Sequence, residues 1–149
     1  MGSNHRARRA FTLVEVLSAL VLLAILASVA VPTVSRAARR YAAWSAGHEL
    51  RSDLVLARTR AVLDGATVRV VVDTMRGRYV VLAASGDTLR HRALGSALLL
   101  RTTAWRQEIL FTSRGTSNLY STTWVGVDGD PDARWHGTRV APTGAVTRM

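Results

Sequence analysis

The feature that most constrains this chain is an apolar run from Phe11 to Val31 in which Glu15 carries the only charge. A helix of about 20 apolar residues spans the hydrocarbon core of a bilayer, and it satisfies its own backbone amides where lipid offers no partners. The residues before the run are polar and basic, and they include three arginines. The sequence therefore predicts one membrane-spanning helix near the N-terminus.

Three interpretations of the run differ in how they treat Glu15. A secretory signal peptide, with a small-x-small cleavage site at Ser28-Val29-Ala30, gains nothing from an acidic residue, and neither does a plain membrane anchor. An acidic side chain inside a membrane helix costs about 2.5–3.5 kcal/mol on insertion scales, which makes it a functional candidate. The competing explanation is that Glu15 lies near the helix start and reaches the polar interface.

The residues around Glu15 resemble the class III signal of type IV pilins and type II secretion pseudopilins. The junction between Ala10 and Phe11 follows a basic leader, Glu15 is the fifth residue after the junction, and Pro32 is the twenty-second. The resemblance implies that a prepilin peptidase cleaves after Ala10 and that the new amine of Phe11 is N-methylated. The residue before the cut is normally Gly in these families, and Ala10 is the nearest small substitute.

The same resemblance implies an assembly role for Glu15 and Pro32. In such filaments the helices bundle in an apolar core, and the Glu15 carboxylate pairs with the N-terminal ammonium of a neighbouring subunit. A buried ion pair adds little net stability, whereas an unpaired buried charge is heavily penalised, so this pair would set register and recruitment. Pro32 stands where these subunits commonly have a helix-weakening proline, and we expect the helix to continue past it with a kink or local unwinding.

Beyond the run the sequence predicts an amphipathic continuation of the same helix that ends near Leu63. Small and apolar residues recur at steps of three and four, which is typical of one helix face packed against a sheet. These residues are Ala43, Gly47, Leu50, Leu54, Ala57 and Ala61. Gly65 follows Asp64 and is the usual left-handed cap of a helix.

After Gly65 the pattern changes to alternating, β-branched residues, which predict strands. The predicted strands are 67–73, 78–82, 97–102, 106–112, 120–127, 136–141 and 145–148, with turns at 75–77 and 85–87. Strands that follow one long helix predict an α+β fold, in which the helix packs on a C-terminal antiparallel β-sheet domain. The expected parts are a leader at 1–10, a transmembrane or filament-core helix at 11–31, its amphipathic continuation at 32–64 and a β-rich domain at 65–149.

The second half of the chain resembles the GspH/FimT group of minor pseudopilins and minor pilins. The resemblance is carried by the helix end Asp53–Gly65 and by two glycine-containing segments, Phe111–Gly115 and Val140–Val146. It implies a pilin-like subunit that primes or caps a type II secretion pseudopilus or a type IV pilus in protein export. Its partners would be other pilins or pseudopilins, the prepilin peptidase and exported cargo. The resemblance also implies a single-pass protein of the bacterial inner membrane with its C-terminal domain in the periplasm.

The charge balance leaves nucleic acid open as an alternative partner. The chain has 20 basic residues, all arginine, against 10 acidic residues, for a formal net charge of +10. The FimT branch takes up DNA with a C-terminal tail that resembles Gly-Arg-x-Arg, and the matching stretch here is Gly144–Arg148, with Ala145 in place of the first arginine. A competence minor pilin that binds DNA is the second hypothesis, with Arg139 and Arg148 as the contact residues to test.

Two pairs place a tryptophan beside an arginine, namely Trp105 with Arg106 and Trp135 with Arg134. Such pairs occur in nucleic-acid binders, where aromatic rings stack on bases and arginines contact the backbone. The favoured interpretation is that the tryptophans fill the core and the arginines lie outside.

The sequence gives no support for catalysis or a cofactor and little for a metal site. The chain has no cysteine, which excludes disulfides, thiolate zinc sites and thiol nucleophiles. Its four histidines show no ligand spacing. Asp128, Asp130 and Asp132 alternate as calcium ligands do, yet Ala133 and Arg139 stand where an EF-hand loop has Gly and Glu, so an ordinary turn is favoured. We therefore expect a structural protein, and a secreted globular protein with an ordinary signal peptide is the third hypothesis.

Overall fold

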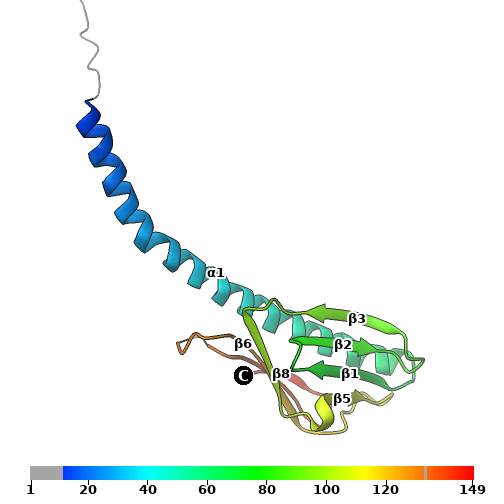
Figure 1. Cartoon of the computed structure of the whole chain (residues 1–149). Coiled ribbons are helices and arrows are strands. Elements are labelled where there is room, and N and C mark those ends of the chain that lie inside the picture. Colours follow the sequence, from blue (N-terminus) through cyan, green and yellow to red (C-terminus); the bar gives the residue numbers. More distant parts are fainter. Residues whose placement is uncertain (1–11, 133) are drawn as a thin grey trace, which may run out of the picture. The chain divides into compact units, whose positions relative to one another are not determined.

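The computed structural model describes residues 12–132 and 134–149, so Ala10 and Phe11 lie outside the described residues. These residues form one long helix, α1 (Leu13–Leu63), followed by strands and a short 3-10 helix (Figure 1). The strands are β1 (Val68–Asp73), β2 (Arg78–Leu82), β3 (Thr88–Ala93), β4 (Leu98–Thr102), β5 (Glu108–Phe111), β6 (Ser121–Val127), β7 (His136–Val140) and β8 (Val146–Arg148), and the 3-10 helix η1 (Trp105–Gln107) precedes β5. The chain divides into two compact units between Ala37 and Ala38.

In the first unit α1 presents apolar side chains on every side. The large apolar side chains from Leu13 to Val34 are all exposed, among them Leu13 at 77% and Val31 at 66%. A helix that is apolar all round has no polar face to turn toward water, so this segment needs lipid or other helices around it. By length and composition the helix can cross a membrane.

Pro32 lies inside α1 and does not interrupt it. The helix continues past Pro32 as predicted. The residues on both sides of Pro32 are helical, so the local unwinding that the sequence allowed at this position does not occur. Proline removes one N–H from the helical ladder. Two hydroxyls close to it bond back to the preceding turn, Thr33 Oγ1 to the carbonyl of Val29 and Ser35 Oγ to the carbonyl of Pro32, each at 2.9 Å. Pro32 therefore weakens the ladder without ending the helix.

In the second unit α1 buries a single face, and it is the predicted one. Its buried residues are Ala43, Gly47, Leu50, Leu54, Ala57 and Ala61. The part of this face from Leu50 to Ala61 packs in one core with apolar residues of both sheets, among them Val70, Phe111 and Val125. The helix ends at Leu63 as predicted, and Gly65 follows it with a left-handed φ of 61°.

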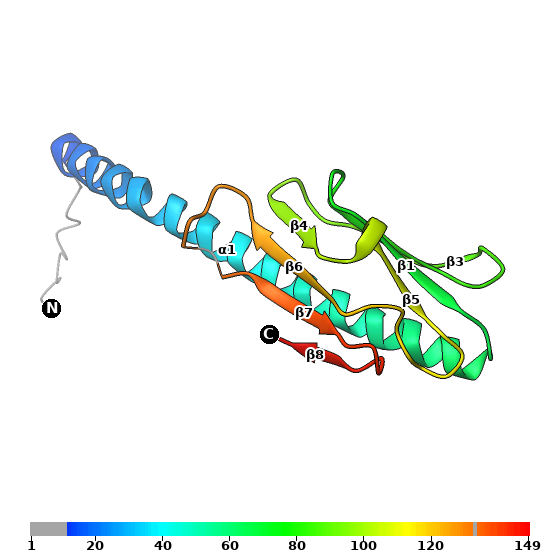
Figure 2. The same ribbon diagram turned by 90° about the horizontal axis from the view of Figure 1, so that it is seen from below.

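The strands form two antiparallel sheets of four strands each, in the orders β3-β2-β1-β5 and β4-β6-β7-β8. Figure 2 shows β6, β7 and β8 of the second sheet side by side along the second half of α1. Side chains alternate between the two faces of a strand. On β1, Val68, Val70 and Val72 are buried, whereas Arg69 is exposed. The predicted pilin-like α+β fold, a long helix packed on antiparallel sheet, is confirmed.

The strand prediction missed β3 and began β5 too early. In β3 only Leu89 is partly buried, so the alternation that signals a strand is absent. β3 is an edge strand, and its charged side chains discourage pairing with other chains. Residues 106–107 belong to η1 and not to a strand, because Arg106 and Gln107 have φ values of 53° and 58°. The Gln107 Oε1 atom accepts the backbone N–H of Thr74 at 3.2 Å, which holds this turn against the first sheet.

Polar contacts fasten the first sheet to α1. The buried Tyr79 hydroxyl donates to Asp53 Oδ2 at 2.8 Å. Two arginines of β3 add ion pairs. Arg90 Nε lies 4.0 Å from Asp53 Oδ1, and Arg92 Nε lies 3.6 Å from Glu49 Oε2. Burial, and then the neighbouring Asp53 carboxylate, raise the pKa of Tyr79 far above its ordinary value, so this hydroxyl stays protonated and keeps donating.

Candidate functional site

The candidate assembly site lies at the first turn of α1, where Thr12 caps the helix. The backbone N–H of Glu15 donates to Thr12 Oγ1 at 3.2 Å. A threonine followed three residues later by glutamate is the signature of a capping box, which satisfies free N–H groups at a helix start. Sequence reasoning missed this role of Thr12, although its spacing to Glu15 signals it.

Glu15 is a carboxylate in the first turn of an otherwise apolar helix segment. The positive end of the helix dipole favours an acidic side chain at this position. Within residues 12–132 and 134–149, no basic side chain forms an ion pair with it. The carboxylate is therefore open to a cation from outside the described residues.

In the second sheet two glycines let tryptophan rings lie flat on the backbone. A Cβ on Gly126 would lie 2.7 Å from the Trp135 ring, and one on Gly137 would lie 2.8 Å from the Trp124 ring. Trp124 pairs with Gly137 across β6 and β7. Both rings therefore cover the face of this sheet that points away from the core, since Val125, the neighbour of Trp124, is fully buried.

Arginines stack on aromatic rings of the same face. The guanidinium carbon of Arg101 lies 4.9 Å from the centre of the Trp135 ring, and that of Arg139 lies 5.4 Å from the centre of the Tyr120 ring. Strand pairing places Arg101 opposite Trp124 and Arg139 opposite Thr122, which puts both arginines on one side of the sheet. We call the surface formed by Arg101, Tyr120, Trp124, Trp135 and Arg139 the arginine–aromatic face.

The prediction that tryptophans fill the core is wrong. Trp105 is 65% exposed and Trp135 is 39% exposed. Arg106 stacks on Trp105 at 4.5 Å, as the sequence pair allows, but the partner of Trp135 is Arg101 and not its neighbour Arg134. For Trp135 the error follows from Gly126, which creates a flat surface site that the sequence around Trp135 does not show.

The two arginines predicted as DNA contacts lie on opposite faces of the second sheet. Arg148 on β8 pairs with Thr138 on β7, so it points to the same side as Thr138, whereas Arg139 is the next residue and points to the other side. Arg139 belongs to the arginine–aromatic face, and Arg148 faces α1. The structure does not bring the two residues together.

The three aspartates considered as calcium ligands, Asp128, Asp130 and Asp132, lie in the loop between β6 and β7. Asp130 pairs with Arg40 of α1, its Oδ2 atom 3.0 Å from Arg40 Nε, and its Oδ1 atom accepts the backbone N–H of Asp132 at 3.1 Å. The backbone N–H of Asp128 donates to the carbonyl oxygen of Ala97 at 2.9 Å. In the described part of the chain, no group of three or more His, Cys, Asp or Glu side chains is arranged to hold a metal ion.

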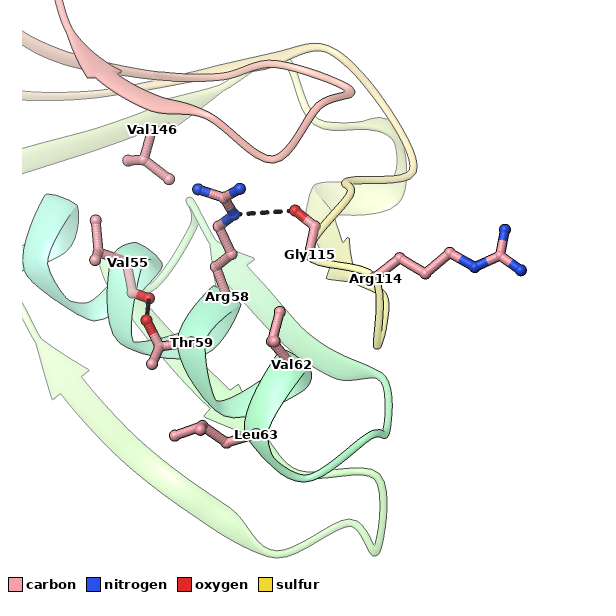
Figure 3. A pocket seen from close by; sticks show the side chains of 8 residues that line it. All are labelled: Val55, Arg58, Thr59, Val62, Leu63, Arg114, Gly115 and Val146. Carbon is pink, nitrogen blue, oxygen red and sulfur yellow. Dashed lines mark hydrogen bonds between the residues drawn. The ribbon is translucent and has the colours of Figure 1, made fainter.

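Two glycine turns meet beside Arg58 of α1. Gly115 and Gly144 have left-handed φ values of 74° and 76°, and a Cβ on Gly144 would overlap the backbone carbonyl of Gly115. Arg58 Nε donates to this carbonyl at 3.0 Å (Figure 3). The two glycine-containing segments singled out in the sequence are therefore one junction, which joins the end of β5 to the turn between β7 and β8.

A cavity of about 480 Å³ opens next to this glycine junction. Its apolar lining comes from Val55, Val62, Leu63 and Val146, while Arg58 adds a charged edge and Arg114 points away into solvent (Figure 3). Val55, Val62 and Leu63 are all well exposed for apolar residues of a folded domain. The cavity is suited to an apolar side chain of a protein partner.

The sequence matches two protein families along most of its length. Residues 5–31 match the prokaryotic N-terminal methylation motif, and residues 46–144 match the family described as type II transport protein GspH. No match is found among curated proteins.

Solved structures of pilin-like subunits share the fold. The minor pseudopilin EpsH from the type 2 secretion system of Vibrio cholerae aligns with a TM-score of 0.61 and 17% identity, covering 72% of this chain and 95% of that one. The type IV minor pilin FimU of Pseudomonas aeruginosa aligns with a TM-score of 0.62 and 21% identity, covering 74% of this chain and 90% of that one. At these identities the likeness concerns the fold.

The glycine junction predicts a strong effect of Gly144→Ala. The new Cβ would overlap the carbonyl of Gly115, so the backbone must shift in addition to straining a positive φ. Gly129→Ala is the matched control, because Gly129 has a φ of 69° and no atom within 4 Å of the added Cβ. We expect Gly129→Ala to lower the free energy of unfolding by about 1 kcal/mol and Gly144→Ala to lower it by at least about 2 kcal/mol more. Chemical denaturation of the full chain in neutral detergent measures both, and equal losses would contradict the junction.

Proposed function

The chain belongs to the type II transport protein GspH family, and we propose on that premise that it is a minor subunit that primes or caps a type II secretion pseudopilus or a type IV pilus. The observation that carries the proposal is one helix that is apolar and exposed on every side in its first half and serves as the core helix of a folded domain in its second half. Such a first half needs lipid before assembly and neighbouring helices after it. A subunit of this kind can pass from a membrane into a filament without refolding its β-rich domain.

Glu15 recruits the subunit and sets its register in this proposal. A carboxylate among apolar helices is costly unless a cation pairs with it. Cleavage after Ala10 creates such a cation, the N-terminal ammonium at Phe11 of a neighbouring subunit, and methylation of this amine preserves its charge. The match of residues 5–31 to the methylation motif supports the pairing.

The proposed location is the bacterial inner membrane, with the β-rich domain in the periplasm. The apolar span of α1 supports membrane anchoring. Arginines flank the span on both sides, three before it and Arg36, Arg39 and Arg40 after it, so the charge rule for orientation is nearly balanced. The outward direction of the domain therefore rests on membership of the family.

The β-rich domain supplies the surfaces that recognise neighbours or cargo. The cavity beside the glycine junction exposes Val55, Val62 and Leu63 next to Arg58. An apolar patch with a charged edge is typical of a protein-binding surface. It would accept an apolar side chain of a neighbouring subunit or of an exported protein.

The proposal predicts the covalent state of the mature N-terminus. In a host with an active prepilin peptidase, we expect mass spectrometry of the purified subunit to find N-methyl-phenylalanine at Phe11. The leader at 1–10 is then absent. A mature chain that begins at Val31 would instead support the secreted globular protein, and an intact leader would contradict processing.

A second prediction concerns the charge of Glu15. Glu15→Gln keeps the shape of the side chain but leaves the neighbour's ammonium unpaired in an apolar bundle, at a cost of about 3–5 kcal/mol. We expect its incorporation into filaments to fall at least about tenfold while membrane insertion and cleavage continue. Recovery of the mature subunit in sheared filaments, relative to membranes, measures this.

Ser18→Ala is the control for Glu15→Gln. Ser18 lies one turn further on and its hydroxyl donates only to the carbonyl of Glu15 at 2.9 Å, inside the helix. Its incorporation should match that of the wild type. Wild-type incorporation of Glu15→Gln would remove the assembly role of the carboxylate.

Nucleic acid is a second candidate partner, and the arginine–aromatic face is the observation that favours it. Arg101 and Arg139 are held in place by the Trp135 and Tyr120 rings, and no described carboxylate forms an ion pair with either of them. Stacked guanidinium groups and exposed aromatic rings are what proteins offer to single strands. The proposal is DNA contact by this face, with Arg139 as one contact residue.

A shift assay with single-stranded DNA tests this candidate. We expect the double variant Arg101→Gln/Arg139→Gln to bind more weakly and to lose about 0.7 from the slope of log affinity against log salt for each phosphate contact removed. The control is Arg60→Gln/Arg69→Gln, which removes the same charge from exposed positions outside this face. Equal losses in both variants would show that only net charge matters.

A further inference from the structure

A basic pocket lies between the second half of α1 and the edge of the second sheet. Its lining combines four side chains that can carry positive charge, taken from three elements: His48 and Arg51 from α1, His136 from β7 and Arg148 from β8. Gly47, Gly137 and Thr138 complete the lining, and the enclosed space is about 10 Å³, so a ligand would sit at its mouth and not inside it. We call this site the basic pocket.

A close approach of α1 and β7 brings these groups together. A Cβ on Gly47 would lie 2.7 Å from the Cβ of His136, so only glycine allows β7 to start this near the helix. Pairing of Thr138 with Arg148 then turns Arg148 to the same side of the sheet as His136, two residues before Thr138. Met149 is held beside β7 by its backbone N–H, which donates to the carbonyl of Gly137 at 2.9 Å.

The surrounding charges leave the basic pocket without a paired carboxylate among the described residues. On α1, Glu49 pairs with Arg92 and Asp53 binds the hydroxyl of Tyr79, both toward the first sheet. In the loop before β7, Asp132 and Arg134 line a neighbouring pocket that also touches His136, so one carboxylate and one further cation lie on that side.

His136 reports the excess of positive charge. Burial lowers its pKa below the ordinary value of 6.5, and the charges of Arg148, His48 and Arg134 lower it further. An anion at the mouth of the pocket would relieve this repulsion and favour protonation of the histidine. The Trp44 ring packs against His48 at 4.4 Å between ring centres, tilted by 56°, and this contact steadies the imidazole.

We propose that His48, Arg51, His136 and Arg148 form a binding site for a phosphate group. Two guanidinium groups match the geometry of phosphate oxygens, and they keep their charge at any physiological pH. The two imidazoles add further N–H donors. The site lies on the opposite side of the second sheet from the arginine–aromatic face, and it does not depend on the filament proposal, because it belongs to a single subunit.

Thermal unfolding of the full chain in neutral detergent, with inorganic phosphate titrated at constant ionic strength, tests the site. A ligand that binds the folded state raises the melting temperature in proportion to its occupancy, so the titration yields a dissociation constant. We expect phosphate to stabilise the chain more than chloride does. Equal effects of phosphate and chloride would overturn the proposal.

Paired variants separate a built site from general charge. Arg51→Gln/Arg148→Gln should raise the phosphate dissociation constant at least about tenfold, since each guanidinium removed takes away charge-assisted hydrogen bonds. Arg60→Gln/Arg69→Gln removes the same charge from exposed positions outside the pocket and should leave the constant within about twofold of the wild type. An equal loss in both variants, or no loss in either, would overturn the site.

The source of the phosphate is distinguished by a second titration with a short single-stranded oligonucleotide. If the site takes a phosphodiester backbone, inorganic phosphate competes with the oligonucleotide and Arg51→Gln/Arg148→Gln weakens both. If it takes a free phosphate, the variant loses phosphate binding while oligonucleotide binding is unchanged. Either result supports the site, whereas oligonucleotide binding that is lost only in Arg101→Gln/Arg139→Gln, with phosphate binding unaffected by every variant, contradicts it.

Discussion

The constraint on which the rest of the structure depends is that one helix has to satisfy two different surroundings. In its first half α1 is apolar on every side, and only lipid or other helices can cover it. In its second half it buries one face and leaves the others to water. Because a helix makes its backbone hydrogen bonds within itself, the same element is stable in both places. The β-rich domain is therefore built on a single helical face, and Glu15 is the one charge that the apolar half carries.

Close packing in the domain depends on small residues at the points of contact. Gly47 lets β7 approach α1, and Gly144 lets two turns touch. Glycines on the outer side of the second sheet act differently, since two tryptophan rings pack on them, and one of these rings, that of Trp135, supports Arg101. The same residue type thus builds both the interior of the domain and the arginine–aromatic face, in each case because a Cβ would occupy the space of a neighbouring atom.

The sequence predicted the elements whose residues report their own surroundings. Residue spacing and β-branching predicted the buried face from Ala43 to Ala61, the helix end at Leu63 and most strands. They do so because buried positions recur along the sequence with the period of a helix or a strand. It missed β3, whose side chains are exposed except for the partly buried Leu89. It also predicted a strand at Arg106, because nothing in the residue types signals two left-handed non-glycine residues. It also placed Trp105 and Trp135 in the core. For Trp135 the reason is that Gly126, on which its ring packs, lies on β6 and not beside it in the sequence.

By itself the sequence determined that an apolar span with a single carboxylate precedes an α+β domain, and that the span carries a methylation motif, because these properties reside in consecutive residues. Only the tertiary structure decided which distant residues become neighbours. It separated Arg139 from Arg148, joined Gly115 to Gly144, and gathered histidines and arginines from α1, β7 and β8 into one basic pocket. The physical reason is that strand register and helix–sheet distance, which set these contacts, arise from packing across the whole domain and are not written in any one segment.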